Sequence, residues 1–114
     1  MHTDFESFKV YREKMNQKIL DSDNLDIKRF FALDSSVYRK GILKEKTKEL
    51  MGLVASTVLR CNDCILYHID RCVESGVTDA EFQEAISIAL VVGGSITIPH
   101  IRYAFEMYDK LSGK

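Results

Sequence analysis

Apolar side chains recur every three or four residues along most of the chain, which is the period of an α-helix packed on one face. The clearest example is residues 43–60, where the apolar positions are Leu50, Leu53, Val54, Ala55 and Val58. Similar spacing predicts helices over residues 5–20, 25–33, 61–75, 79–92 and a last stretch that ends near 111. No segment alternates apolar and polar residues convincingly, as a strand does. The pattern therefore predicts an all-α fold of about five to six helices.

Local signals mark where the later helices begin and end. Thr78 and Glu81 form a capping box, in which each side chain satisfies a backbone N–H at the start of a helix. The Gly93-Gly94 pair predicts the end of that helix. Pro99 must lie before the last helix or in its first turn, because an interior proline costs about 3 kcal/mol.

The N-terminal third of the chain carries no recognisable chemical motif. Its polar run Asp34-Ser35-Ser36 predicts an interruption after a short helix over residues 25–33, with one further turn before Gly41. We predict that residues 1–36 form a helical segment that packs on a core made by residues 37–114. A chain of 114 residues is long enough to bury one hydrophobic core, so both parts are expected to form one compact domain.

Composition narrows the classes of partner. Sixteen basic and seventeen acidic side chains give a net charge of −1, so we expect neither a nucleic-acid partner nor a membrane partner. The longest uncharged stretch, residues 85–101, contains two glycines and a proline, which predicts a buried segment with a break and not a bilayer span. Acidic residues at positions 4 and 6 replace the basic and apolar start of a secretory signal, which predicts a cytoplasmic location.

The most informative stretch is Cys61-x-x-Cys64, followed four residues later by His68. At the start of a helix, both sulfurs lie near unpaired backbone N–H groups, which favours the thiolate over the thiol. The spacing also brings the two Cα atoms to roughly 5–6 Å, within disulfide range. One cysteine can therefore attack a substrate while the other resolves the product. His68 lies one helical turn after Cys64, so it can accept the proton of the Cys64 thiol and return it to a leaving group.

A histidine in this role needs a third group that fixes its tautomer, and Glu49 on the preceding helix is the candidate. Glu49, eleven residues, Cys61-x-x-Cys64, three residues and His68 together resemble the motif of alkylhydroperoxidase D (AhpD)-like proteins in the carboxymuconolactone decarboxylase superfamily. The flanking stretches are similar as well, namely Lys46-Thr47-Lys48-Glu49-Leu50, the ten residues from Gly76 to Ala85, and Gly93-Gly94. The resemblance covers about residues 37–111.

This resemblance implies a thiol-dependent peroxidase with an all-α fold. Cys64 would react with the hydroperoxide substrate, Cys61 would resolve it, and His68 and Glu49 would form a proton relay. The family resemblance further implies a homo-oligomer, trimeric or hexameric, with no metal or organic cofactor. It also implies reduction by a dihydrolipoamide-bearing or other thiol partner, and a role in regenerating a peroxiredoxin.

Two features depart from the simplest form of this hypothesis. Asp63 stands before Cys64 where some family members have a histidine, and its negative charge should oppose thiolate formation. The chain also carries a single copy of the motif, so it would have to complete its core or its site by oligomerising.

Three alternatives remain open from the residues alone. His68 and Glu49 suit proton transfer in a carboxymuconolactone decarboxylase-like lyase, with incidental thiols. A non-catalytic helical module could use the pair for redox sensing, or hold zinc with the two cysteines, His68 and either Glu49 or His100. We interpret Cys72 as a small buried apolar residue and His100 as a helix-start or interface residue.

Overall fold

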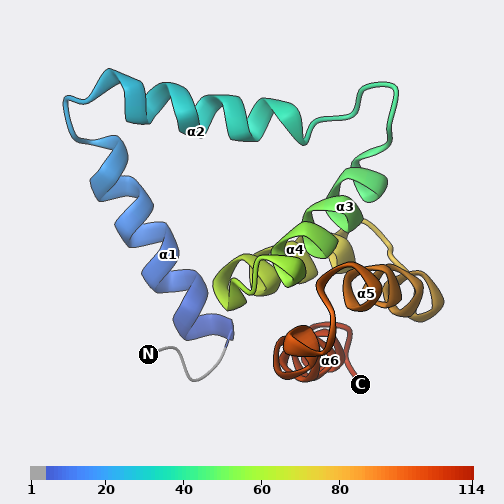
Figure 1. Ribbon diagram of the computed structural model, residues 1–114. Coiled ribbons are helices and arrows are strands. Elements are labelled where there is room, and N and C mark those ends of the chain that lie inside the picture. The colour runs from blue at the N-terminus through green and yellow to red at the C-terminus, as the bar shows by residue number, and fades with distance from the viewer. Residues whose placement is uncertain (1–4) are drawn as a thin grey trace. The chain divides into compact units, whose positions relative to one another are not determined.

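The computed structural model describes residues 5–114, which fold as two compact units, one up to Arg39 and one from Lys40 onward. The first unit contains α1 (Phe5–Leu20) and α2 (Leu25–Val37) (Figure 1). The second unit contains α3 (Glu45–Val58), α4 (Asn62–Glu74), α5 (Asp79–Gly93), the 3₁₀ turn η1 (Ser95–Thr97) and α6 (Ile98–Leu111). All regular structure in residues 5–114 is thus helical, which confirms the predicted all-α fold.

α2 is longer than the sequence pattern predicted, and this prediction was wrong. The helix continues through Asp34-Ser35-Ser36 and ends at Val37, with no break after residue 33. Asn24 caps its first turn, since its side-chain oxygen accepts from the backbone N–H of Ile27 at 3.0 Å. The hydroxyl of Ser36 donates to the carbonyl of Leu33 at 2.9 Å, so this polar side chain bonds back to the helix and does not end it.

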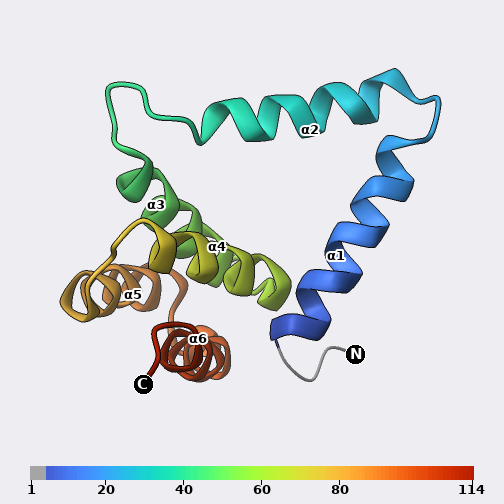
Figure 2. The same ribbon diagram turned by 180° about the vertical axis from the view of Figure 1, so that it is seen from behind.

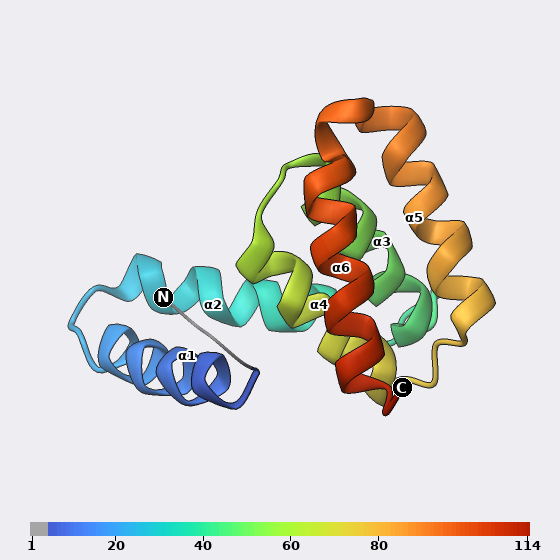
Figure 3. The ribbon, with the colours of Figure 1, turned by 90° about the horizontal axis from the view of Figure 1, so that it is seen from below.

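The second unit is built on a hairpin of α3 and α4, which lie side by side and are joined by residues 59–61 (Figure 2). α3 also packs on α5, and α4 packs on α6. η1 connects α5 to α6, so these two helices run in opposite directions from a shared end (Figure 3). Each helix of the α3–α4 hairpin, which carries the predicted site, is therefore packed against one further helix.

Aromatic and aliphatic side chains fill the interior of this unit. The ring of Phe82 on α5 stacks on Tyr108 of α6 at 4.2 Å between centroids and meets Phe105 edge-on at 5.2 Å. The Tyr108 hydroxyl donates to a carboxylate oxygen of Asp79 at 2.8 Å, so the buried ring has a partner for its polar end. The other large buried apolar side chains of the unit are Leu53, Ile65, Leu66, Ile69, Ile86 and Met107.

The start and end signals act where the sequence placed them. Thr78 and Glu81 make both hydrogen bonds of the capping box at the start of α5. Gly94, with φ of 80°, follows the last residue of that helix, and Pro99 lies in the first turn of α6. No helix within residues 5–114 combines the length and apolar character that crossing a bilayer requires.

Candidate active site

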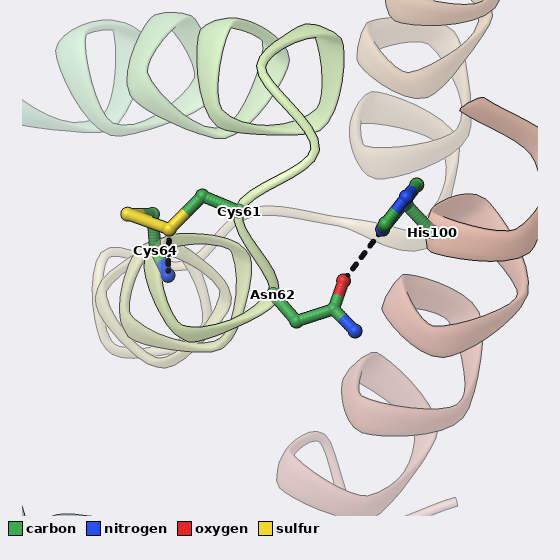
Figure 4. Close-up of a disulfide and its surroundings, with 4 residues drawn as sticks. All are labelled: Cys61, Asn62, Cys64 and His100. Carbon is green, nitrogen blue, oxygen red and sulfur yellow. Dashed lines mark hydrogen bonds between the residues drawn. A yellow bond between two sulfur atoms is a disulfide. The ribbon is translucent and has the colours of Figure 1, made fainter. Parts of the chain in front are cut away.

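The first turn of α4 presents the two cysteines. Cys61 is the N-cap residue, and its sulfur accepts a hydrogen bond from the backbone N–H of Cys64 at 3.2 Å. The two residues are joined by a disulfide, with their Cα atoms 5.2 Å apart (Figure 4). Cys64 is exposed and Cys61 is half-buried. The CxxC segment is therefore an accessible disulfide at the N-terminal end of a helix dipole.

The chain enters this turn through an unusual backbone conformation. Arg60 has φ of 62°, in the left-handed region that residues other than glycine rarely adopt. The backbone N–H of Cys61 then donates to the carbonyl of Ser56 on α3 at 3.1 Å. This sharp connection turns the chain from α3 into α4 and fixes where Cys61 caps the helix.

His68 and Glu49 form a buried pair between the two helices of the hairpin. Nδ1 of His68 lies 2.9 Å from Oε1 of Glu49, and these residues are only 8% and 5% exposed. A carboxylate only accepts hydrogen bonds, so Nδ1 is the protonated nitrogen and proton exchange falls to Nε2. The hairpin therefore brings together the two residues that the sequence spacing paired, 19 positions apart.

Cys72 lies one helical turn beyond His68 and is completely buried. Burial, and then the negative charge of Glu49, raises the pKa of the Cys72 thiol to about 12. Cys72 is therefore a protonated thiol at neutral pH, which agrees with its interpretation as a small buried side chain.

The start of α6 contributes residues that the sequence did not connect with the cysteines. Nδ1 of His100 lies 2.8 Å from Oδ1 of Asn62, the residue that follows Cys61 (Figure 4). Tyr103 lies one turn further along α6; burial, and then the charge of Asp63, raises its pKa. Asn62, between the two cysteines, thus has a hydrogen-bond partner on α6. Only packing of α4 on α6 creates this proximity, so no local spacing could have indicated it.

The zinc hypothesis required side chains that converge on one point. Within residues 5–114, no group of three histidine, cysteine, aspartate or glutamate side chains is placed to hold a metal ion. Cys61 and Cys64 are bonded to one another, while His68 and His100 are engaged with different partners. The donor geometry therefore favours a dithiol–disulfide site, with the His68–Glu49 pair on the same helical hairpin.

The chain is similar to known proteins both in sequence and in fold. The sequence profile of the carboxymuconolactone decarboxylase family matches residues 27–107. The chain belongs to this family. The profile match begins at residue 27, within α2. The resemblance of the sequence motifs begins later, at about residue 37. The similarity of this chain to the carboxymuconolactone decarboxylase family thus extends well beyond the region around the cysteines.

Solved structures of other members have a similar fold. Two crystal structures of a family protein from Thermotoga maritima are 57% identical to this chain, with TM-scores of 0.89 and 0.93. They cover 93% and 96% of this chain and 90% and 96% of that one, and the Thermotoga protein is described as possibly involved in an antioxidative response. A family member from Legionella pneumophila, 23% identical with a TM-score of 0.72, shares the fold over 94% of this chain and 88% of its own.

One curated sequence relative of this family member comes from Paracoccus denitrificans. It is described as uncharacterized protein 4 in the cox locus, and it is 29% identical over 84 residues. The match covers 74% of this chain and 76% of the relative.

Proposed function

We propose that this protein is an AhpD-like, thiol-dependent peroxidase that cycles Cys61 and Cys64 between dithiol and disulfide. The observation that carries the proposal is an accessible disulfide at the start of α4, with the buried His68–Glu49 pair on the same helical hairpin. Membership of the carboxymuconolactone decarboxylase family supports it, as does the antioxidative response in which the Thermotoga maritima relative is described as possibly involved.

The oxidative half-reaction begins with Cys64, because its side chain is exposed. Its thiolate attacks the outer oxygen of a hydroperoxide: an S–O bond forms, the O–O bond breaks, and the alkoxide leaves as an alcohol after taking a proton. The Cys61 thiolate then attacks the sulfur of the sulfenic acid. The S–S bond forms and hydroxide leaves as water after taking a second proton.

His68 moves the protons of this half-reaction. Its Nε2 takes the Cys64 proton, directly or through one water, and returns it to the departing alkoxide. Glu49 accepts from Nδ1, so it holds the tautomer that leaves Nε2 as the exchanging nitrogen and stabilises the imidazolium between the two steps.

The reductive half-reaction needs an external dithiol, such as a dihydrolipoamide-bearing partner or another thiol reductant in the cytoplasm. We infer that the reductant attacks Cys64, the exposed sulfur, and that Cys61 leaves as a thiolate. The Cys64 N–H and the helix N-terminus stabilise that thiolate. The second thiol of the reductant then releases Cys64, so the reductant leaves as a disulfide. We also propose a peroxiredoxin as a downstream partner, whose disulfide the Cys61–Cys64 dithiol would reduce.

A single-turnover experiment tests the function. The reduced protein, freed of reductant, is mixed with one equivalent of tert-butyl hydroperoxide. We expect consumption of one hydroperoxide per chain and loss of two hydrogen atoms from the protein mass, because one disulfide forms. Dihydrolipoamide should then sustain turnover. Persistence of both the hydroperoxide and the free thiols would contradict the proposal. Turnover of a carboxylated lactone by protein lacking both thiols would instead support the lyase alternative.

We also propose that the protein acts as a homo-oligomer. An apolar groove of about 680 Å³ lies between α3 and α5. It is lined by side chains that include Met51, Leu59, Ile88 and Val92, which are 53% or more exposed. A contiguous apolar patch of this kind favours a covering partner. The occupant that the family resemblance supports is a second copy of this chain.

A charge inserted into the groove tests the assembly. We expect Ile88→Glu to shift the protein to monomers in size-exclusion chromatography with light scattering, because the glutamate would lose hydration in a contact between copies. Ile42→Glu is the matched control, since Ile42 is fully exposed outside the groove and its variant should keep the wild-type mass. A monomeric wild-type protein would overturn this part of the proposal.

A further inference from the structure

The first turn of α6 touches the segment between the two cysteines. Asn62 is the first residue of α4 after the N-cap Cys61, and its side-chain oxygen lies 2.8 Å from Nδ1 of His100. The two residues are 38 positions apart in sequence (Figure 4). Because an amide oxygen accepts, Nδ1 of His100 is the donor. This hydrogen bond therefore ties the redox turn to a helix outside the α3–α4 hairpin.

We propose that His100 is a positioning residue: through Asn62 it holds the first turn of α4 so that Cys61 stays next to Cys64 after the disulfide opens. The inference rests on the proposed function for its catalytic meaning. Its physical content, the poise of the Cys61–Cys64 couple, can be measured without any peroxide.

The need for such a tie follows from the local backbone. The first N–H groups of a helix have no partners within the helix, so its first turn frays readily. The left-handed conformation of Arg60, just before Cys61, is unfavourable for a residue with a side chain and favours relaxation of this connection. While the disulfide is closed, it restrains the turn covalently. When it opens, the turn keeps the bond from the Cys61 N–H to Ser56 on α3 and the bond from His100, which lies outside the α3–α4 hairpin.

A longer-range electrostatic effect also connects this turn with α6. Burial raises the pKa of the Tyr103 phenol, and the negative charge of Asp63, the other residue between the cysteines, raises it further. His100 and Tyr103 are three residues apart on α6 and thus share one face. The hydrogen bond of His100 thus places this face of α6 beside Asn62.

The expected consequence concerns the effective concentration of one thiol at the other. Without His100 the dithiol form gains conformational freedom, so closing the disulfide becomes less favourable. We expect His100→Ala to lower the equilibrium constant for disulfide formation about three- to ten-fold, which for a two-electron couple makes the potential about 15–30 mV less negative.

A double-mutant cycle tests the inference. His100→Ala, Asn62→Ala and the double variant are equilibrated in dithiothreitol buffers of graded poise, and the disulfide fraction is read by mass after acid quenching and alkylation. We expect equal shifts in the two single variants and no further shift in the double variant, since each removes the same bond. His100→Gln should restore part of the wild-type value because its amide can donate to Asn62. Arg102→Ala, an exposed change on α6, should leave the equilibrium constant unchanged.

Each outcome decides between the two proposals. An unchanged equilibrium constant in both single variants, with wild-type far-UV circular dichroism, overturns the role of His100 and leaves the peroxidase proposal standing. Additive shifts in the double variant also overturn it, because they would show independent effects. A coupled shift in a protein that does not consume hydroperoxide supports the positioning role and defeats the peroxidase proposal.

Discussion

Replacing Cys64 with serine is expected to reduce hydroperoxide consumption to the rate of protein-free buffer. The serine hydroxyl cannot form the sulfenic acid through which the proposed cycle passes, and no other sulfur can replace Cys64. Cys61 is half-buried as the helix cap, and Cys72 is a fully buried, protonated thiol. The measurement is loss of tert-butyl hydroperoxide with dihydrolipoamide as reductant.

Cys61→Ser is the matched variant, since it removes the other sulfur of the same disulfide and leaves an N-cap residue that can still accept from the Cys64 N–H. This variant should reduce one equivalent of hydroperoxide and then stop, with a sulfenic acid on Cys64 that dimedone traps. If the outcomes are exchanged, so that Cys64→Ser gives the single turnover, Cys61 is the attacking residue. Full turnover in both variants would remove the thiols from the mechanism.

Replacing Glu49 with glutamine is expected to slow oxidation of the reduced protein by about 10²- to 10⁴-fold, the usual range for losing general acid–base catalysis. Glutamine keeps the size of the side chain and an oxygen that can accept from Nδ1 of His68. It removes the charge that stabilises the imidazolium. His68→Gln should lower the rate constant by a similar factor. The measurement is stopped-flow mixing of the reduced protein with excess hydroperoxide.

A surface carboxylate on the same helix serves as the control. Glu74 is exposed on α4 and pairs with Arg71 at 2.7 Å, so Glu74→Gln changes the net charge equally without touching the buried pair. It should keep the wild-type rate constant, because an exposed ion pair contributes little. Wild-type rate constants in folded Glu49→Gln and His68→Gln proteins would show that the buried pair has no part in the chemistry.

The local signals in the sequence were sufficient for most of the helical fold. The capping box at Thr78 and the proline at the start of α6 each depend on neighbours within four residues, and both predictions are confirmed. α2 was predicted too short because Asp34-Ser35-Ser36 resembles a break, whereas Ser36 bonds back to the helix that contains it. Propensity therefore failed where a polar side chain had a local acceptor.

In the site as well, contacts between neighbouring helices were predictable from the sequence, whereas contacts that depend on tertiary packing were not. The pairing of Glu49 with His68 was predictable because a hairpin of two adjacent helices brings such positions together, and the contact is present. The bond between His100 and Asn62 depends on how α6 crosses α4, a packing angle that no short stretch of sequence encodes. The catalytic roles themselves stay predictions until the variants are measured.

The buried Cys72 thiol gives each molecule an internal reporter of unfolding. An alkylating reagent reaches it only when the interior opens, and the same molecule carries Cys61 and Cys64 at an accessible helix end. Tag counting by mass would therefore separate chains that were merely reduced from chains that had lost their tertiary packing. The redox state of the Cys61–Cys64 pair and the loss of folded structure could thus be measured in one sample.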